Sequence, residues 1–275
     1  SGRLRRERTV GQKHKNEREK TDWGVLYFSG TGNTRYCVSL LSDSLGRKEI
    51  PCPIEKKEAV EVLRSHEALI LAYPIQYSNL PDIVRVFIEQ NRECWRGKQV
   101  FLMATMGLFS GDGTGVAARL LKKYGAVVTG GVHIRMPDSV ADVKTLIKPE
   151  EENRQIVAAA REKVRRTAER IKQGKMPRQG LGVFSHLLGL FGQRLYFWNA
   201  AQKYKNALKI DTKKCMGCGQ CAACCPRENL FMNGKIPHQK GNCTMCYRCI
   251  SACPAQAITL IGKEVVEQIR IEKFL

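Results

Sequence analysis

The residues with the clearest chemical potential lie in two cysteine runs near the C-terminal end of the sequence. Each run has the spacing C-x2-C-x2-C-x3-C and is followed directly by proline. The eight cysteines are Cys215, Cys218, Cys221, Cys225, Cys243, Cys246, Cys249 and Cys253. Thiolates at this spacing hold [4Fe–4S] cubes, and the fourth cysteine of each run ligates the cube of the other run. The runs therefore predict one-electron transfer through two clusters.

The crossing of the fourth cysteine predicts two ligand sets. One cluster is assigned to Cys215, Cys218, Cys221 and Cys253, and the other to Cys225, Cys243, Cys246 and Cys249. Zinc is one alternative, but zinc sites use four ligands in two pairs, without a third cysteine followed by Cys-Pro. A disulfide framework is the other, and it needs an oxidising compartment. The first residues are charged and contain no apolar core of signal-peptide length, so we expect a cytoplasmic protein.

A second motif follows the first predicted strand and reads Ser29, Gly30, Thr31, Gly32, Asn33 and Thr34. A loop between a strand end and a helix start has unpaired backbone N–H groups, and the helix dipole favours an anion there. The hydroxyl and amide side chains add donors, and the glycines allow close backbone approach. The loop has no lysine, so it is not a G-x4-G-K-[ST] nucleotide loop. It suits the terminal phosphate of FMN, with an ordinary turn as the alternative.

Short apolar strands and helical patterns alternate along the first part of the chain. Strands are expected at 23–29, 48–54, 68–73, 99–105 and 126–134, and helices at 34–45, 58–64, 81–89, 114–124 and 150–172. Buried strands separated by helices imply a parallel sheet covered on both faces. The predicted fold class is an α/β, doubly wound, five-stranded parallel sheet of flavodoxin-like order, followed by a small α+β dicluster domain.

On these motifs, Trp23 to about Lys172 resembles flavodoxins, and about Ile210 to Ile261 resembles dicluster ferredoxins. Together they resemble the flavodoxin–ferredoxin fusion proteins of anaerobic bacteria and archaea. The resemblance places the isoalloxazine ring of FMN at the carboxyl ends of the third and fourth strands, where open α/β sheets bind ligands. Beyond the phosphate loop, the expected flavin-binding residues are Pro74, Ile75, Gln76, Tyr77, Thr105, Met106, Gly107, Phe109 and Gly111.

Two details of the ring-binding loops bear on the flavin. Tyr77 and Phe109 are candidates for stacking on the ring, and loop packing is the alternative for each. Flavodoxins have a glycine in the third-strand loop whose peptide flips to accept a hydrogen bond from reduced N5. The stretch from Pro74 to Asn79 has no glycine. This departure puts a stable neutral semiquinone in doubt.

The expected division of the chain has five segments. These are a disordered basic extension (1–22), the FMN-binding domain (23–173), an aromatic and glycine-rich connector (174–207), the dicluster domain (208–263) and a C-terminal tail (264–275). The connector carries too many apolar side chains for a free linker. We expect it to pack between the domains, with docking of a partner or a peripheral membrane contact as alternatives. The tail is expected to pack back on the body.

The formal net charge is +20, from 46 basic and 26 acidic residues. Basic residues surround the cysteine runs, so we expect an acidic redox partner protein. Nucleic acid binding is the other interpretation of a basic chain, but the excess charge is spread along the sequence and we do not expect it. No apolar run approaches the roughly 20 residues that a membrane helix requires.

The expected function is electron transfer between two [4Fe–4S] clusters, FMN and a redox partner. The alternative is an enzyme whose flavin reduces a small organic or quinone-like substrate with electrons from the clusters. A third reading is an oxygen-sensing regulatory module. The sequence contains no recognisable set of nucleophile, base and orienting residue, so no catalytic residue is assigned and an electron carrier is favoured over an enzyme.

Overall fold

The computed structural model describes residues 22–47, 49–76, 79–108, 113–182 and 204–275. Nearly all of the expected N-terminal extension lies outside these residues, as do the apolar and aromatic middle of the connector (183–203) and three expected flavin ligands, Tyr77, Phe109 and Gly111. Within the described part of the chain, no helix is long and apolar enough to cross a membrane.

The larger unit is built on one parallel sheet with the order β2-β1-β3-β4-β5. This order confirms the predicted flavodoxin-like sheet. β3 and β4 are the central strands and their side chains are almost all buried, as expected for strands covered on both faces. The strands are β1 (Trp23–Tyr27), β2 (Cys52–Pro53), β3 (Ala68–Pro74), β4 (Gln99–Met106) and β5 (Val127–Arg135).

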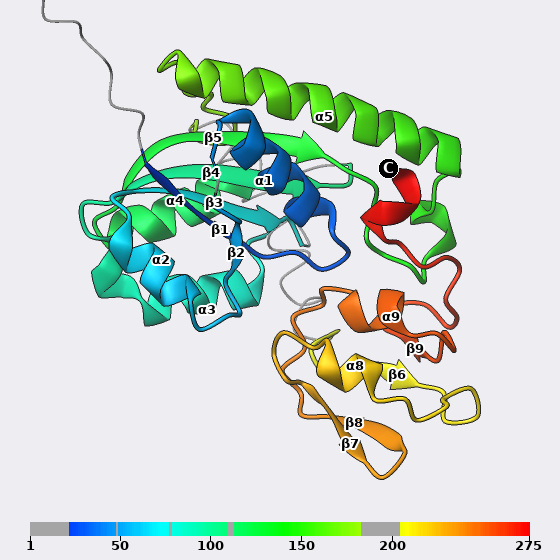
Figure 1. Cartoon of the computed structure of the whole chain (residues 1–275). Helices are drawn as coiled ribbons and strands as arrows, with labels where there is room; N and C mark the ends of the chain where they lie inside the picture. The colour runs from blue at the N-terminus through cyan, green and yellow to red at the C-terminus, as the bar shows by residue number, and fades with distance from the viewer. Residues whose placement is uncertain (1–21, 48, 77–78, 109–112, 183–203) are drawn as a thin grey trace, which may run out of the picture.

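Helices cover both faces of this sheet (Figure 1). One layer contains α1 (Asn33–Ser44) and the long α5 (Glu150–Lys172), and the other contains α2 (Ala59–Ser65), α3 (Asp82–Gln90) and α4 (Gly113–Lys123). Short 3-10 turns lie at Arg92–Trp95, Lys144–Leu146 and Ile271–Phe274 (η4). Two separate apolar cores result, one on each side of the sheet. The predicted helices are all confirmed to within a residue or two of their ends.

The edges of the sheet differ from expectation. β2 comprises only Cys52–Pro53, shorter than the predicted 48–54, because prolines at 51 and 53 lack the N–H that a longer ladder requires. At the other edge the start of the connector pairs with β5. Gly131 donates to the carbonyl of Pro177 at 2.7 Å, and Gln179 donates to the carbonyl of Gly131 at 2.9 Å. The connector thus shields an edge that would otherwise be open.

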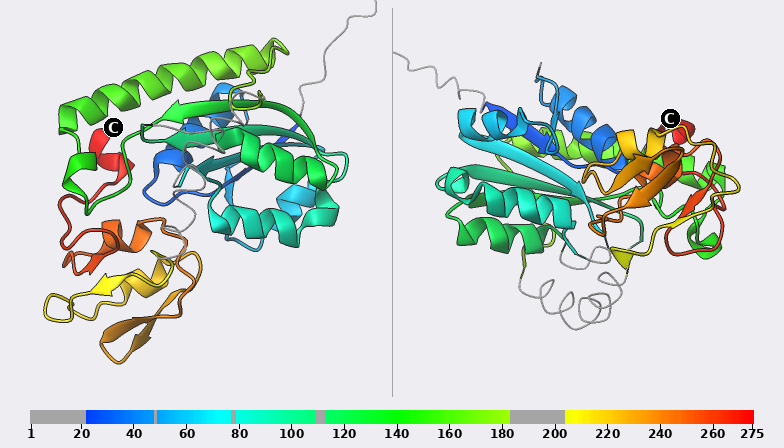
Figure 2. Two further views of the ribbon diagram at one scale, coloured as in Figure 1. Left: turned by 180° about the vertical axis from the view of Figure 1, so that it is seen from behind. Right: turned by 90° about the horizontal axis from the view of Figure 1, so that it is seen from below.

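The smaller unit contains two antiparallel strand pairs and two short helices (Figure 2). Its elements are β6 (Lys209–Ile210), α8 (Gln220–Ala223), β7 (Leu230–Asn233), β8 (Ile236–Gln239), α9 (Arg248–Ala252) and β9 (Ile258–Thr259). β6 pairs with β9, and β7 with β8. Six of the eight motif cysteines lie partly or wholly in its apolar core alongside Leu230, Ile250 and Leu260.

The two units meet at the carboxyl edge of the sheet. Asp142, which follows β5, accepts hydrogen bonds from the backbone N–H groups of Leu260 (2.7 Å), Ile261 (2.9 Å) and Gly262 (3.1 Å). It also accepts the hydroxyl of Tyr247 at 2.9 Å. Three backbone donors converging on one buried carboxylate fix the smaller unit against the larger one.

The segment after β9 returns to the larger unit, as predicted for the tail. Ile271 and Phe274 in η4 are buried in the core that α1 and α5 share. On the way, the side chain of Gln268 donates to the carbonyls of Ile250 and Cys253, and Arg270 donates to the carbonyl of Ser251. The tail therefore binds both units together.

Candidate functional site

The eight motif cysteines surround two separate cavities in the smaller unit. One cavity is lined by Cys215, Cys218, Cys221 and Cys253, and we call it the outer cluster site. The other is lined by Cys225, Cys243, Cys246 and Cys249, and we call it the inner cluster site. The structure thus brings together the cysteines in the two sets that the crossing pattern predicts, including the exchange of the fourth cysteine between runs.

The arrangement of these cysteines fits cubes better than single ions. The described residues contain no group of three or more His, Cys, Asp or Glu side chains placed around one metal ion. A zinc ion would draw its sulfurs to about 2.3 Å from one point, whereas a cube holds its thiolates apart at separate corners. All twelve cysteines are free thiols in the structure.

Burial makes thiols of both sites harder to ionise, and most strongly at the inner site. It raises the pKa of the Cys246 thiol to about 12, raises the pKa of Cys249 well above the ordinary value, and also raises the pKa of Cys221 at the outer site. The pKa of Cys243 is raised for the same reason. A thiolate is the form that binds iron, so these groups must give up protons when a cluster forms.

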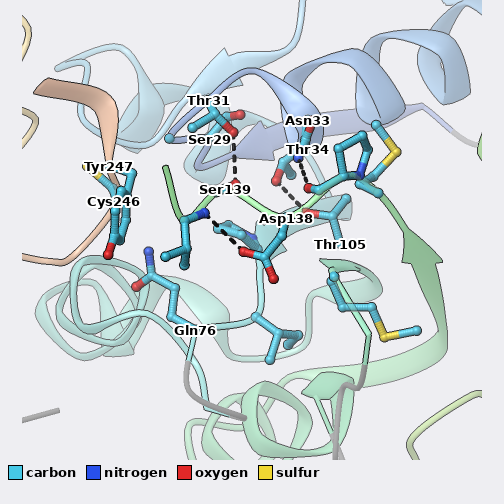
Figure 3. A pocket seen from close by; sticks show the side chains of 18 of the residues that line it. Ser29, Thr31, Asn33, Thr34, Gln76, Thr105, Asp138, Ser139, Cys246 and Tyr247 are labelled. Carbon is cyan, nitrogen blue, oxygen red and sulfur yellow. Dashed lines mark hydrogen bonds between the residues drawn. The ribbon is translucent and has the colours of Figure 1, made fainter. Parts of the chain in front are cut away.

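A third cavity of about 310 Å³ lies between the phosphate-loop motif and the smaller unit (Figure 3). Eleven of the expected flavin-binding residues line it: Ser29, Gly30, Thr31, Asn33, Thr34, Pro74, Ile75, Gln76, Thr105, Met106 and Gly107. Gly32 does not. It faces a neighbouring polar cavity, and its φ of 97° explains the need for glycine there. We call the 310 Å³ space the flavin cavity, after the cofactor that the sequence predicts.

The side chains of the phosphate loop are held by the end of β4 and by the loop after β5. The hydroxyls of Thr31 and Ser139 are 2.8 Å apart, as are those of Thr34 and Thr105. Asn33 donates from Nδ2 to the carbonyl of Pro137 at 2.8 Å. The loop leads into the N-terminus of α1, where backbone N–H groups lack partners within the helix and the helix dipole favours an anion.

Unpaired polar atoms show that the flavin cavity is suited to a polar ligand. Among the described residues, Ser29 Oγ, Asn33 Oδ1 and Gln76 Oε1 are buried without a hydrogen-bond partner, and all three residues line this cavity. Gln76 is oriented because its Nε2 donates to the carbonyl of Met245 at 3.3 Å. Buried polar groups are rarely left unpaired without a ligand or water. The Ser29 hydroxyl can donate to a phosphate and the amide oxygen of Gln76 can accept an N–H of a ring, so these residues fit a flavin phosphate and ring.

The inner cluster site and the flavin cavity share a wall. Met245, Cys246 and Tyr247 line both of them. Met245 and Tyr247 have positive φ values of 53° and 60°, which is unusual for residues other than glycine. Gly217 and Gly219 are at the corresponding places of the first run, with φ of 71° and 73°. The second run therefore carries side chains in a strained conformation where they face the flavin cavity.

Sequence reasoning missed the loop after β5 as part of this cavity. Met136, Pro137, Asp138, Ser139 and Val140 all line it. A signal was present, because the carboxyl ends of parallel strands share one edge of the sheet and β5 was predicted. The contributions of Met245 and Tyr247 had no such signal, since a motif does not reveal which domain it packs against.

Asp138 is the only carboxylate among the described residues that line the flavin cavity, and no lysine or arginine accompanies it. Its Oδ1 accepts the backbone N–H of Val140 at 3.0 Å. Burial raises the pKa of Asp138, and backbone hydrogen bonds from Val140 and Ser139 oppose that shift. The cavity therefore holds a carboxyl group that keeps its proton to a higher pH than an exposed aspartate does.

Arg248 joins the two units beside this wall. Its guanidinium donates to the carbonyl of Ser29 at 2.7 Å, to the carboxylate of Glu55 at 2.6 Å and to the carbonyl of Cys224 at 3.3 Å. One side chain of the second cysteine run thus binds the phosphate loop, a carboxylate of the larger unit and the first cysteine run. Glu55 is the charge partner that raises the pKa of Arg248 against the effect of burial.

Two family models match the chain, and they match different parts of it. A flavodoxin domain model matches residues 24–125. A 4Fe-4S dicluster domain model matches residues 207–264, which include both cysteine runs. No curated protein matches the chain.

Solved structures similar to the chain include flavodoxins. Megasphaera elsdenii flavodoxin in its two-electron reduced form is 24% identical over 51% of this chain and 99% of its own, with a TM-score of 0.38. Fusobacterium nucleatum flavodoxin bound to flavin mononucleotide is 16% identical over 55% and 97%, with a TM-score of 0.39. The rubredoxin oxygen:oxidoreductase of Desulfovibrio gigas is 14% identical over 53% and 35%, with a TM-score of 0.35. These low scores add nothing to the two family matches.

Proposed function

Because the chain joins a flavodoxin domain to a 4Fe-4S dicluster domain, we propose that it carries electrons in the order outer cluster, inner cluster and FMN, or in the reverse order. When bound, FMN accepts one or two electrons and each cluster accepts one. The segments divide this work: 23–173 holds FMN, 208–263 holds two clusters, and 264–275 fastens the two parts together. The single observation that supports the order is the wall of Met245, Cys246 and Tyr247 between the inner cluster site and the flavin cavity.

The residues of the flavin cavity have separate roles in this proposal. The backbone of Ser29 to Thr34 and the side chains of Ser29, Thr31 and Asn33 bind the phosphate. Gln76, Thr105, Met106 and Gly107 contact the ring from the ends of β3 and β4. Tyr77, Phe109 and Gly111 stay as expected ring contacts that lie outside the described residues. The smaller unit closes the cavity and excludes water from the side nearest the inner cluster.

The outer cluster site is the proposed port for a redox partner. Cys218 is exposed, and the neighbouring Met216 is 63% exposed. Lys213, Lys214 and Lys235 are exposed around this site, and Gly217 packs directly against Lys235. Positive charge around a surface cluster favours encounter with an acidic redox protein. Cluster thiolates persist in a reducing compartment, which supports the cytoplasm as the proposed location.

One experiment tests the order of transfer. The protein is purified without oxygen and its iron, sulfide and flavin are counted, with about eight, eight and one expected per chain. Rapid mixing with a dithionite solution should then bleach the clusters before the flavin. Cys218→Ser, which removes an outer ligand, should slow flavin reduction several-fold, while Cys94→Ser, outside the motifs, should not. Flavin reduction at an unchanged rate in cluster-free protein would refute the order.

The port is tested by charge reversal. Lys213→Glu, Lys214→Glu and Lys235→Glu together should slow electron exchange with an acidic bacterial ferredoxin, and most strongly at low salt. Lys122→Glu with Lys123→Glu, on α4 of the larger unit, is the control for Lys213→Glu with Lys214→Glu, which reverses the same number of charges. Equal rates for the two variants would exclude this surface as the port.

Asp138 favours a second candidate function, in which the flavin reduces a small organic or quinone-like substrate. A carboxyl group in the flavin cavity can deliver the proton that such a reduction consumes. Turnover of a panel of quinones and nitroaromatic acceptors, above the rate of free FMN and lost in Asp138→Asn, would establish the enzyme. Equal rates for the protein and for free FMN would exclude the enzyme and favour the electron carrier.

A further inference from the structure

The two cysteine runs are copies of one pattern displaced by 28 residues. Cys215, Cys218, Cys221 and Cys225 correspond in turn to Cys243, Cys246, Cys249 and Cys253. The same displacement pairs Asn229 with Ala257. The chain therefore contains an internal comparison between its own two cluster sites, in which equivalent positions carry different side chains.

The loops that contain Asn229 and Ala257 have the same backbone structure. The N–H of Asn229 donates to Cys225 Sγ at 3.2 Å, and the N–H of Ala257 donates to Cys253 Sγ at 3.4 Å. The residues before them, Glu228 and Gln256, both have a φ of 48°. What distinguishes the two loops at this position is the side chain: an amide beside the inner site and a methyl group beside the outer site.

The amide of Asn229 is oriented toward the inner cluster site. The residue is fully buried and lines that cavity. Its Oδ1 accepts the backbone N–H of Asn242 at 2.8 Å, which fixes the orientation of the amide. Its Nδ2 then has no partner among the described residues. An unpaired buried amide is costly, so this donor is best explained by a ligand in the cavity.

Thr244 provides a second, independent difference of the same kind. It is 3% exposed, lines the inner site, and its Oγ1 has no partner in the described part of the chain. The corresponding residue of the first run is Met216, which is 63% exposed. Among the described residues that line the outer site, none has a buried side-chain nitrogen or oxygen atom without a partner.

We infer that Asn229 Nδ2 and Thr244 Oγ1 donate hydrogen bonds to the sulfur atoms of the inner cluster and raise its reduction potential. Reduction adds negative charge to a cluster, and a buried site disfavours that charge. Hydrogen bonds to the sulfurs favour the reduced form and offset the effect of burial. The inner cluster then stays reducible beside the flavin. This inference rests on the cluster assignment made under the proposed function.

Reciprocal exchange of the two side chains is the test. Asn229→Ala and Ala257→Asn are made in the full chain, and the potentials of both clusters are measured by titration followed by electron paramagnetic resonance. Asn229→Ala should lower the inner potential by about 59 mV, which corresponds to a roughly tenfold change in a one-electron equilibrium. Ala257→Asn should raise the outer potential, and so identifies which signal belongs to which site.

A third variant and two control measurements separate this effect from a structural one. Thr244→Val keeps the shape of the side chain but removes its O–H, and it should lower the inner potential alone. Asn229→Ala also removes the acceptor for Asn242 N–H, so iron content and melting temperature are measured alongside the potential. If Asn229→Ala cannot hold the inner cluster, Thr244→Val and Ala257→Asn decide the question.

The outcomes distinguish this inference from the proposed function. Unchanged potentials in Thr244→Val and Ala257→Asn, or equal shifts of both clusters in Asn229→Ala, would overturn the inference while the clusters themselves are present. Absence of iron and sulfide from the unaltered protein would overturn the proposed function instead.

Discussion

A methyl group on Gly30 would lie 2.0 Å from the backbone carbonyl oxygen of Cys246. The phosphate loop and an inner-cluster ligand are therefore in direct backbone contact, with no room for a side chain. Real Cβ atoms do not approach other atoms so closely, so any larger residue at position 30 must displace one of the two backbones. This one contact links the binding of FMN to the docking of the smaller unit against the larger one.

Gly30→Ala should therefore weaken FMN binding by about tenfold or more, because a misplaced loop loses hydrogen bonds to the phosphate. Iron content should stay unchanged, since no cluster ligand is altered. The dissociation constant can be measured by quenching of flavin fluorescence. Gly182→Ala is the control, because a methyl group there meets nothing within 4 Å. Equal affinity in the two variants would show that the loop can shift at no cost.

Loss of the clusters should also weaken FMN binding, although no flavin contact is removed chemically. The wall formed by Met245, Cys246 and Tyr247 belongs to a run that is ordered by its cluster. Protein treated with a chelator and an oxidant should bind FMN about tenfold more weakly than protein that contains its clusters. A tenfold change corresponds to the loss of about one buried hydrogen bond. An unchanged affinity would mean that the smaller unit keeps its structure without iron.

Asp142→Ala should separate the two units. The change removes the one carboxylate oxygen, Oδ2, that accepts the backbone N–H groups of Leu260, Ile261 and Gly262. We expect a loss of roughly 2–4 kcal/mol in the free energy of unfolding, from buried donors left unpaired. Urea denaturation measures it, with Asp43→Ala at an exposed position of α1 as control. A loss below about 0.5 kcal/mol, typical of a surface change, would contradict this role.

The pH dependence of FMN binding should reflect Asp138. Because burial raises its pKa above 3.8, the carboxyl is protonated in the folded protein over a range where it is ionised in the unfolded chain. Its contribution to stability is thus full below the unfolded pKa and lost as the pH rises through the folded pKa. An ionised Asp138 also repels the FMN phosphate, so FMN should bind more tightly as the pH falls through that range.

Comparison with Asp138→Asn isolates this effect from ionisation of the phosphate itself, which affects both proteins equally. The difference in FMN affinity between the two proteins should grow with rising pH and then level off. Isothermal titration calorimetry across the range measures it. A constant difference at all pH values would show that Asp138 does not change its charge there.

Arg248 and Glu55 should couple more strongly than a surface ion pair. Their side chains are 25% and 18% exposed, and Arg248 also binds two backbone carbonyls. A double-mutant cycle with Arg248→Met and Glu55→Gln should give about 1–3 kcal/mol. The pair of Arg154 and Glu150 on α5, 45% and 46% exposed, is the matched control and should give about 0.5 kcal/mol or less. Similar values for both pairs would mean that Arg248 acts on each unit separately.

The sequence predicted the elements whose signals are local. Alternation of apolar strands and amphipathic helices led to the parallel sheet and its order, and the flavodoxin and dicluster family matches agree with it. The spacing of the cysteines predicted two ligand sets, and the two cavities divide the cysteines in the same way. Each of these signals lies within a short stretch of chain.

Contacts between distant stretches could not be predicted in this way. Nothing around Asp142 indicates that it binds backbone N–H groups more than a hundred residues later. Nothing in the second cysteine run indicates that Met245 and Tyr247 face a flavin cavity. Their left-handed backbone does not indicate it either, because Gly217 and Gly219 of the first run have the same conformation and do not line that cavity. Such contacts depend on how two domains dock, which is decided by shape and burial over the whole interface.

The path of the tail has a consequence for the order in which the protein matures. Ile271 donates its N–H to the carbonyl of Thr31 at 3.1 Å, and its side chain packs where a Cβ on Gly32 would lie. The ribosome makes the phosphate loop first, both cysteine runs next, and Ile271 after them. The loop therefore gains its last support from a segment that follows every cluster ligand in the sequence, so a growing chain contains all eight thiols before the flavin site is finished.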